Sequence, residues 1–275
     1  MIKALFLDLD GTLLNNKKEI TDITKTTLKE CKKKGIKLFI VTARPPLHEK
    51  MLSWNENLIS LFDGGSYYNG GCIIIDNHKK YITISGDIVQ GVIKLACQDE
   101  KLNIALQLEH EKHAFRFPLD EKGYNIWGVP ADEALELDKT NNLQIVKILA
   151  FHSNLADSVT PINGEIVKNI ESFCTGRAQY YLSDKGKAIQ IMAESVSKLN
   201  SIEEMRNYYK MEKNEIAVFG DDVPDMEMLC EYEYGFAMGN AESHIKEKAR
   251  FITLDNNNDG VHHAICNILK LCNRG

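Results

Sequence analysis

The sequence predicts an α/β protein with a doubly wound, Rossmann-like parallel sheet and an inserted α+β domain. Apolar runs of strand length alternate with helix-like segments near both ends of the chain. Several of these runs stop at polar groups, as the strands of an open parallel sheet do at their carboxyl ends. The middle of the chain breaks this alternation, and 275 residues exceed the usual size of a single domain. We therefore expect core segments at residues 1–84 and 188–275, with the inserted α+β domain at 85–187.

The first core segment begins with a short apolar run, Ile2 to Leu7, that is typical of a buried strand in a parallel sheet. Gly35 is placed to end the helix that follows, and Pro45-Pro46 suits the start of a second helix. The elements expected here are strands at 2–7, 36–41, 67–76 and 80–84, a polar turn at 77–78, and helices at 20–34 and from 45–46 toward 61.

The second core segment repeats the alternation of helix and strand. Ser201 and Glu204 have capping-box spacing, and Asn240 is placed to cap a later helix. The expected elements are helices at 197–209, 224–230, 241–249 and 260–271 and strands at 216–219, 234–238 and 251–254, with 256–259 as a polar turn. In the inserted domain we expect helices at 88–97 and 164–173 and strands at 104–108, 143–151 and 178–182.

Composition narrows the class of protein. A net charge of −6 offers no general attraction for nucleic acid or an anionic membrane, so we expect neither as a partner. No apolar run approaches the length that spans a bilayer, and Asp8 and Asp10 interrupt the first one too early for a signal-peptide core. The seven cysteines are odd in number and scattered, which favours reduced, mostly buried thiols in a cytoplasmic protein.

The most informative feature is a pair of carboxylates, Asp8 and Asp10, at the end of the first apolar run. Alternate residues of an extended strand share a face, and Gly11 permits the backbone to turn after them. Two acids crowded at this point destabilise one another unless a cation or a reacting group compensates them. A plain boundary between strand and loop would need only one of them. We therefore interpret the pair as functional.

Polar groups follow two further apolar runs. Thr42 follows the run at 36–41, and Asp221-Asp222 follows the run at 216–219, with Asp225 close behind. Lys198 lies near the start of a predicted helix. Carboxylates, a hydroxyl and an ammonium at one edge of a sheet suit phosphoryl transfer, in which positioning and neutralisation of charge supply most of the catalysis.

These motifs resemble, in order and spacing, the four motifs of the haloacid dehalogenase-like superfamily. The residues that carry the resemblance are Asp8-Leu-Asp10-Gly-Thr12, Thr42, Lys198 and Gly220-Asp221-Asp222-x-x-Asp225. Three further segments are similar to the Cof-type sugar-phosphatase subfamily, which has a type IIB cap: Tyr68-Asn69-Gly70-Gly71, Ala237-Met-Gly-Asn240-Ala and Asp259-Gly-Val261. The resemblance implies a hydrolase, and the inserted domain matches the subfamily's cap mainly by its position.

The resemblance implies a role for each site residue. Asp8 would be the nucleophile that forms an aspartyl-phosphate, and Asp10 the general acid and then the general base. We expect the neighbouring carboxylate to raise the affinity of Asp10 for a proton. Mg²⁺ would be held by Asp8, the backbone carbonyl of Asp10 and Asp221, with Asp225 supporting Asp221 or the water shell of the metal.

Further residues are implied in binding the phosphate and the substrate. Thr42 and Lys198 would bind phosphate oxygens, and Lys198 would also hold the nucleophile. The implied substrate-binding residues are Gly11, Thr12, Ala43, Arg44 and Asn240. Structural alternatives stay open for three of these residues: an exposed lysine for Lys198, a helix cap for Asn240 and a simple turn for Arg44 beside Pro45.

Two positions depart from the subfamily's pattern. Pro224 stands where an Asn is usual, and it offers neither a side-chain hydrogen bond nor a backbone N–H. Ala43 stands where Gly is common. His110, His113, His262 and His263 lack the spacing of a metal motif, so we interpret them as surface or core residues.

The sequence thus predicts a Mg²⁺-dependent phosphatase that acts on a small phosphorylated metabolite, such as a sugar phosphate or a phosphorylated cofactor. Two alternatives remain: a phosphomutase or other phosphotransferase, and a non-catalytic phosphate-binding protein. A monomer and a homodimer are both compatible with the sequence.

Overall fold

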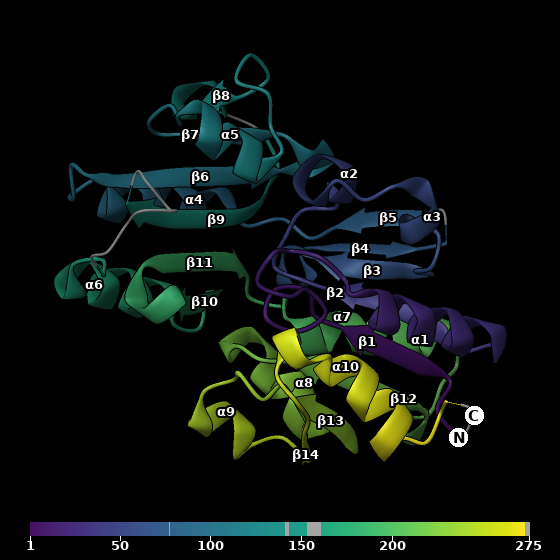
Figure 1. Ribbon diagram of the computed structural model, residues 1–275. Coiled ribbons are helices and arrows are strands. Elements are labelled where there is room, and N and C mark those ends of the chain that lie inside the picture. The colour runs from purple at the N-terminus through teal and green to yellow at the C-terminus, as the bar shows by residue number, and fades with distance from the viewer. Residues whose placement is uncertain (77, 141–142, 153–160, 273–275) are drawn as a thin grey trace. The chain divides into compact units, whose positions relative to one another are not determined.

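The computed structural model describes residues 1–76, 78–140, 143–152 and 161–272, and the chain divides into two compact units (Figure 1). The first unit comprises Met1–Arg44, Trp54–Lys80 and Ser197–Gly275, and the second comprises Pro45–Ser53 and Tyr81–Val196. Among the described residues, no helix combines the length and the apolar character needed to cross a membrane.

The first unit contains a sheet that is parallel over most of its width. Its strand order is β14-β13-β12-β1-β2-β3-β4-β5, in which neighbours from β14 to β3 run parallel and β4 runs antiparallel to β3. The strands are β1 (Ala4–Leu7), β2 (Lys37–Val41), β3 (Gly64–Tyr67), β4 (Cys72–Ile75), β5 (His78–Tyr81), β12 (Ile216–Gly220), β13 (Tyr234–Ala237) and β14 (Phe251–Ile252). The predicted parallel core sheet is confirmed.

The strand order reverses at β1. From β1 the chain proceeds through β2 to β3 on one side, whereas β12, β13 and β14 follow one another on the other side. In open α/β sheets, ligands bind beyond the carboxyl ends of the strands at such a reversal. Asp8 follows β1 and Asp221 follows β12, so both carboxylates lie at this switch point.

Helices cover the first unit's sheet. They are α1 (Asp22–Lys33), α3 (Glu56–Ile59), α7 (Lys198–Tyr208), α8 (Met226–Glu231), α9 (Ser243–Lys246) and α10 (Gly260–His263). Ala4 and Phe6 of β1 pack in one buried cluster with Ile202 of α7 and Leu229 of α8. Because alternate residues of a strand face opposite sides, covering both faces requires the uninterrupted apolar run that β1 has.

The elements between β2 and β5 correct two predictions. The helix expected from Pro45-Pro46 toward Leu61 is two short helices, α2 (His48–Leu52) and α3, because Ser53 adopts a left-handed conformation (φ 52°). The strand expected at 67–76 is interrupted by a turn at Tyr68–Gly70, in which Asn69 has φ 58° and Gly70 has φ 110°. The turn expected at 77–78 includes Asn77, which lies outside the described residues.

Two helix caps also differ from expectation. Ser197, not Ser201, caps α7 by accepting a hydrogen bond from the backbone of Asn200, so Ser201 lies inside the helix and its hydroxyl donates to the Lys198 carbonyl. The helix expected at 241–249 is the shorter α9, which begins after Glu242, so Asn240 caps no helix. The helix expected at 260–271 is α10 followed by a π-helical turn at Ala264–Ile268.

The second unit is a six-stranded sheet with the order β10-β11-β9-β6-β7-β8, antiparallel except between β7 and β8. Its strands are β6 (Leu102–Leu108), β7 (His113–Phe115), β8 (Leu135–Glu136), β9 (Ile145–His152), β10 (Ala178–Ser183) and β11 (Ala188–Ala193), and its longer helices are α4 (Gly86–Ala96), α5 (Glu121–Trp127) and α6 (Gly164–Cys174). The predicted α+β character is confirmed.

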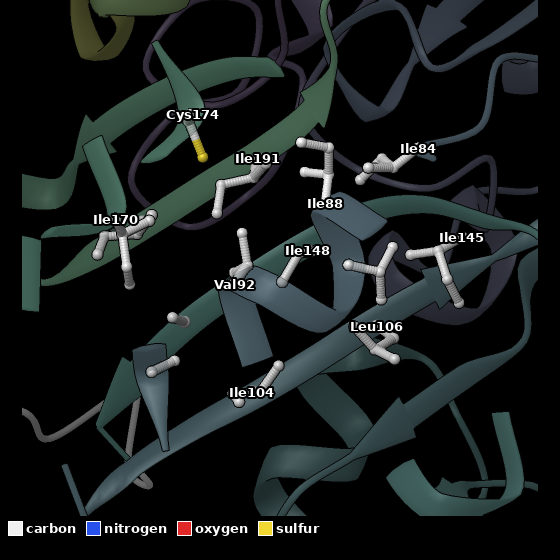
Figure 2. Close-up of a cluster of buried hydrophobic side chains, with 14 of the residues drawn as sticks. Ile84, Ile88, Val92, Ile104, Leu106, Ile145, Ile148, Ile170, Cys174 and Ile191 are labelled. Atoms are coloured by element: carbon white, nitrogen blue, oxygen red, sulfur yellow. The ribbon is translucent and has the colours of Figure 1, made fainter. Parts of the chain in front are cut away.

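Both faces of this second sheet are covered. Ile104 and Leu106 of β6 pack with Ile148 of β9 in a cluster to which α4 and α6 contribute, and Figure 2 shows Ile88 and Val92 of α4 inside it. On the other face, Ala105, Phe115 and Phe151 pack against Trp127 of α5. This two-sided cover is the reason why all seven residues of β6 are buried.

The boundaries of the inserted domain differ from the expected 85–187. Residues 188–193 fall in the predicted core segment 188–275, but they form β11, which pairs with β9 and β10. Ile189 and Ile191 of this strand belong to the second unit's buried cluster. Residues 45–53 also belong to the second unit: α2 approaches Gly128, where a Cβ would come within 2.7 Å of Met51. Tertiary packing, rather than local pattern, sets these boundaries.

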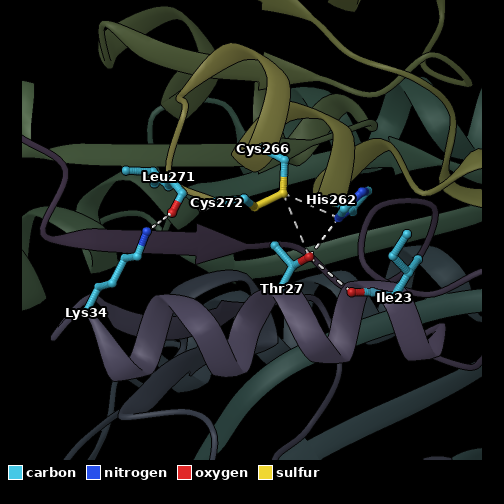
Figure 3. Close-up of a disulfide and its surroundings, with 7 residues drawn as sticks. All are labelled: Ile23, Thr27, Lys34, His262, Cys266, Leu271 and Cys272. Atoms are coloured by element: carbon cyan, nitrogen blue, oxygen red, sulfur yellow. Dashed lines mark hydrogen bonds between the residues drawn. A yellow bond between two sulfur atoms is a disulfide. The ribbon is translucent and has the colours of Figure 1, made fainter. Parts of the chain in front are cut away.

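The expectation of seven reduced cysteines is wrong for one pair, because Cys266 and Cys272 form a disulfide (Figure 3). The other five cysteines of the described residues are not in a disulfide: Cys31, Cys72 and Cys174 are buried, and Cys97 and Cys230 are exposed.

Candidate active site

Asp8, Lys198 and Asp225 form a buried cluster in the first unit. The Lys198 ammonium donates to Asp8 Oδ1 at 2.7 Å and to Asp225 Oδ1 at 2.6 Å. Only 3% of the Lys198 side chain and none of the Asp225 side chain is exposed. The sequence prediction that Lys198 holds Asp8 is matched by this geometry, and the alternative of a solvent-exposed lysine is wrong.

The second oxygen of Asp225 organises the loop after β12. Asp225 Oδ2 accepts hydrogen bonds from the backbone N–H groups of Asp221 and Asp222 at 3.0 and 3.1 Å. Asp225 therefore supports both Lys198 and the loop that carries Asp221. Gly220 makes this possible, because a Cβ at that position would lie 2.4 Å from the Asp225 side chain.

Asp221 is oriented by residues from two other loops. The Thr12 hydroxyl donates to Asp221 Oδ1 at 2.9 Å, and the Asn240 amide donates to Asp221 Oδ2 at 3.1 Å and to the Gly11 carbonyl at 2.9 Å. Gly11 has φ 78°, and a Cβ there would meet Asp221 Oδ2 at 2.2 Å. The glycine after the two acids thus provides both the turn and the space for the third carboxylate.

The segment from Thr42 to Arg44 is held by the turn after β3. The backbone N–H groups of Tyr68 and Asn69 donate to the carbonyls of Arg44 and Thr42 at 3.0 and 2.9 Å. A Cβ on Gly70 would lie 2.4 Å from the Ser197 carbonyl, so this glycine lets the turn approach the start of α7. The Tyr68–Gly71 motif therefore positions Thr42 and Lys198 from the same turn. Ala43 lies half-buried between Thr42 and Arg44.

Asp10 differs from its predicted state. Its carboxylate accepts hydrogen bonds from Arg44 Nε and Nη2 at 2.5 and 2.7 Å and from Lys18 Nζ at 2.6 Å. Burial would raise the pKa of Asp10, but Arg44 and Lys18 outweigh burial and lower it to about 2. The expectation that a neighbouring carboxylate raises its proton affinity is wrong, because Arg44 and Lys18 both bind the Asp10 carboxylate directly and lower its pKa. The bond from Arg44 to Asp10 also shows that Arg44 does more than complete a turn.

The other acids shift in the opposite direction. Burial raises the pKa of Asp8 well above its usual range, although the Lys198 ammonium opposes the shift. Burial and the Asp225 carboxylate raise the pKa of Asp221 to about 7. Burial would lower the pKa of Lys198, but Asp225 and Asp8 outweigh it and raise that pKa. The cluster therefore carries more negative charge than Lys198 balances.

The donor set fits a divalent cation. Carboxylate oxygens of Asp8, Asp221 and Asp225 all lie within 4.8 Å of one another. Three carboxylates and one ammonium carry a formal net charge of −2, which one divalent ion neutralises. Oxygen donors are the ligands that Mg²⁺ and Ca²⁺ prefer. The predicted metal residues Asp8, Asp221 and Asp225 are thus brought together.

Two contributors were missed by sequence reasoning. Lys18 reaches Asp10 from a loop in which it has φ 63°, and nothing in the sequence signals this. Asn256 holds Asn240, because its backbone N–H donates to Asn240 Oδ1 and its amide donates to the Leu14 carbonyl. The segment 256–259, interpreted as a simple polar turn, therefore helps to position Asn240. The spacing of this segment after the Asn240 motif is the sequence feature that could have indicated this role.

Pro224 lies buried in the 3₁₀ turn Val223–Asp225 that follows β12. Asp222 caps this turn, and Pro224 takes a first-turn position, where a helix has no intrahelical partner for the missing N–H. The proline thus stabilises the turn that presents Asp225.

Relatives of known sequence extend over nearly the whole chain. The 5-amino-6-(5-phospho-D-ribitylamino)uracil phosphatases YitU and YcsE of Bacillus subtilis are 25% and 22% identical to it. The YitU alignment covers 93% of both chains, and the YcsE alignment covers 96% of this chain and 94% of the relative.

Solved structures share the fold. A haloacid dehalogenase-like hydrolase from Bacteroides thetaiotaomicron aligns with a TM-score of 0.77 at 25% identity, over 98% of this chain and all of that one. A structure described as the subclass IIB sugar phosphatase BT4131 aligns with a TM-score of 0.80 at 21% identity, again over 98% and 100% of the two chains.

The family comparison agrees with the motifs and the geometry. Residues 5–265 match the family of haloacid dehalogenase-like hydrolases, a range that includes every residue of the site described above. The resemblance predicted from the sequence motifs is therefore confirmed, and the chain belongs to the haloacid dehalogenase-like hydrolases.

Proposed function

We propose that the protein is a Mg²⁺-dependent phosphatase that hydrolyses a small phosphorylated metabolite through an aspartyl-phosphate on Asp8. The observation that carries the proposal is the cluster of Asp8, Asp221 and Asp225 around Lys198 at the switch point of the sheet. Phosphoryl transfer needs a nucleophile and cationic groups at one point, and this cluster supports both.

Asp8 and Asp221 would hold Mg²⁺, together with the backbone carbonyl of Asp10. When bound, the ion supplies positive charge that lets a carboxylate approach a phosphate dianion. Without such charge, two unit charges of the same sign 4 Å apart repel by about 4 kcal/mol at an effective dielectric of 20, and a dianion roughly doubles this. Asp225 would act indirectly, since it already binds Lys198 and two backbone N–H groups.

In the first step, Asp8 Oδ attacks phosphorus, and the bond from phosphorus to the leaving oxygen breaks. Lys198 keeps Asp8 oriented and stabilises the phosphate oxygens, as does the Thr42 hydroxyl. Asp10 gives a proton to the leaving oxygen. In the second step, Asp10 takes a proton from water, whose oxygen attacks phosphorus and releases Asp8 and inorganic phosphate.

The contact with Arg44 provides a way for the proton affinity of Asp10 to differ between the protein without substrate and the protein with bound substrate. In the structure the guanidinium holds Asp10 ionised. We propose that the substrate phosphate competes with Asp10 for both Arg44 and Lys18, which frees Asp10 to carry the proton that the leaving oxygen receives.

A small organic phosphate monoester is the proposed substrate class, and the substrate named for YitU and YcsE, a phosphorylated ribitylamino compound, supports it. We propose the cytoplasm as the compartment, which the five cysteines outside the disulfide among the described residues support. A monomer or a homodimer is the proposed oligomeric state.

The test is release of phosphate from p-nitrophenyl phosphate in Mg²⁺ by purified Asp8→Asn. The variant keeps the shape of the side chain but lacks the nucleophilic carboxylate, so activity should fall roughly a thousandfold or more. Asp22→Asn is the control, because the Asp22 carboxylate is fully exposed on α1 and its variant should match the unmodified protein.

Full activity in Asp8→Asn would exclude the proposed mechanism. Isomerisation of a hexose phosphate without release of phosphate would instead identify a phosphomutase. Tight phosphate binding by the unmodified protein with no hydrolysis of any phosphorylated metabolite in a screen would identify a binding protein.

A further inference from the structure

The two oxygens of the Asp221 carboxylate are held by donors from two different loops. Thr12 Oγ1 donates to Oδ1 at 2.9 Å, and Asn240 Nδ2 donates to Oδ2 at 3.1 Å. A carboxylate oxygen has two lone pairs, so each of these bonds leaves a lone pair that it does not use. One oxygen of Asp221 lies within 4.8 Å of oxygens of Asp8 and Asp225. The two donors therefore orient the Asp221 carboxylate at the candidate cation site.

The partners of the Asn240 side chain determine which way its amide points. The backbone N–H of Asn256 donates to Asn240 Oδ1 at 3.0 Å, and a backbone N–H can only donate. The amide nitrogen therefore lies on the other side, where it donates to the Gly11 carbonyl at 2.9 Å and to Asp221 Oδ2. An amide nitrogen carries two N–H groups, and these two bonds use both of them. The Asn240 nitrogen thus has no N–H left to donate to a substrate phosphate.

Asn256 links the two loops that carry the donors to Asp221. Its side chain is buried, and its Nδ2 donates at 2.8 Å to the carbonyl of Leu14, two residues after Thr12. The backbone N–H of the same residue holds Asn240. Asn256 therefore fixes the positions of Thr12 and Asn240 relative to one another, and so prepares Asp221 before a cation binds.

We propose that Asn240 is a positioning residue for the divalent cation, which acts through Asp221, and that Asn256 sets its orientation. This inference rests on the proposed function in one respect, the binding of Mg²⁺ by Asp221. It gives Asn240 a role other than the substrate binding that the sequence resemblance implies. Loss of a hydrogen bond to a metal ligand typically weakens metal binding by about 10- to 100-fold.

The test measures binding of Mn²⁺ to the full-length protein without substrate, from the electron paramagnetic resonance signal of free Mn²⁺, and binding of Mg²⁺ by competition. Asn240→Ala should raise the dissociation constant of both ions about tenfold or more. Thr12→Val removes the donor to the other Asp221 oxygen and should act in the same direction. Asn57→Ala is the control, because Asn57 is exposed on α3 and its variant should match the unmodified protein.

Kinetics separate this positioning role from substrate binding. At saturating Mg²⁺, the KM of Asn240→Ala for p-nitrophenyl phosphate should return to that of the unmodified protein, whereas a substrate-binding residue would leave KM raised at every Mg²⁺ concentration. The proposal is overturned if the unmodified protein binds neither ion, if Asn240→Ala keeps the unmodified affinity for Mn²⁺, or if its KM stays raised at saturating Mg²⁺. The predicted differences in Mn²⁺ affinity without any release of phosphate would support this inference and contradict only the proposed phosphatase activity.

Discussion

Lys198 balances the charge of the candidate site from inside the protein. Its ammonium lies between Asp8 and Asp225, and all three side chains are buried. Breaking a buried ion pair by removing one partner leaves the other charge uncompensated, which is more damaging than the loss of a surface pair. The same residue is therefore both a structural and a proposed catalytic group.

Lys198→Met should lower the free energy of unfolding by about 3–5 kcal/mol and lower kcat/KM about a hundredfold or more. Urea unfolding and p-nitrophenyl phosphate hydrolysis measure the two effects. The exposed Lys17→Met is the control and should change neither.

The double variant Lys198→Met, Asp225→Asn distinguishes the two roles of Lys198. Removing the Asp225 charge as well should restore part of the lost stability while activity stays low. Full stability of the single variant, or recovery of activity in the double variant, would contradict the assignment.

Asp221 makes stability dependent on pH and on metal. Because burial and Asp225 raise its pKa to about 7, the folded state binds its proton more tightly than the unfolded chain does. The unfolded chain releases this proton at about pH 4, so the contribution of Asp221 to stability is lost as pH rises from about 4 to about 7. A divalent cation competes with the proton and compensates the ionised carboxylate.

We therefore predict that Mg²⁺ raises Tm more at about pH 8 than at about pH 5, measured by thermal unfolding against samples in EDTA. Asp221→Asn should reduce this difference between the two pH values, and the raised pKa of Asp8 accounts for what remains. An equal Mg²⁺ effect at both pH values in the unmodified protein would contradict the charge balance described for the site.

At this scale the sequence predicted the chemistry of the site but not its charge state. Asp8, Asp221, Asp225 and Lys198 could be placed because each adjoins the end of a recognisable strand or the start of a helix. The ionised state of Asp10 could not be predicted, because Lys18 reaches it through a left-handed loop residue that carries no sequence signature.

Strand β13 depends on a glycine that brings a helix close to the sheet. A Cβ on Gly235 would lie 2.2 Å from the backbone oxygen of Leu229 in α8. The backbone of β13 cannot easily move away from α8, because β12 and β14 pair with its two edges. Gly235 thus fixes the distance between α8, which follows the Asp225 turn, and the sheet.

Gly235→Ala should lower the free energy of unfolding by about 1–3 kcal/mol, because the added methyl group overpacks a rigid contact. Gly164→Ala, in the first turn of α6 with open space around it, should be neutral or slightly stabilising. Chemical denaturation of both variants is the measurement, and equal effects of the two substitutions would show that the close approach is unimportant.

The elements that could be predicted are those with a strong local pattern. The runs that became β1, β2, β12 and β13 are apolar, and the first three of them end at polar groups. The prediction of these four strands is confirmed. The break between α2 and α3 occurs at Ser53, which is left-handed although it is not a glycine. Helix α2 belongs to the second unit, whereas α3 belongs to the first. Such breaks are set by tertiary contacts, which a window of sequence does not contain.

Among the described residues, each unit has buried hydrophobic clusters of its own. Ile148 belongs to the second unit's cluster, whereas Phe6 belongs to the first unit's cluster. The chain passes between the units at residues 44–45, 53–54, 80–81 and 196–197. Each unit therefore has its own source of hydrophobic stabilisation.

Ile148→Ala should destabilise the second unit by about 2–5 kcal/mol, because it removes a fully buried side chain from a packed core. Hydrogen exchange should accelerate in peptides from residues 81–196 and stay unchanged in peptides around β1 and β12. Leu143→Ala is the control, since Leu143 is 42% exposed. Equal acceleration in both units would contradict the division into two separately packed units.

At the scale of the molecule, the inserted domain could be predicted but its ends could not. The regular alternation of strand-like and helix-like segments stops after residue 84, which indicated an insertion. The antiparallel sheet of the second unit lies in this part of the chain. Strand β11 resembles a core strand in composition, and only its pairing with β9 and β10 assigns it to the second unit.

The central claim is that Asp8 carries the phosphoryl group during turnover. The most direct measurement is an acid quench during steady-state hydrolysis, followed by reduction with borohydride, digestion and mass spectrometry, since borohydride converts an aspartyl-phosphate to homoserine. We predict homoserine at position 8 in samples quenched with substrate, and none without substrate or in Asp8→Asn. An unmodified Asp8 in every sample that releases phosphate, or homoserine at another aspartate, would contradict the claim.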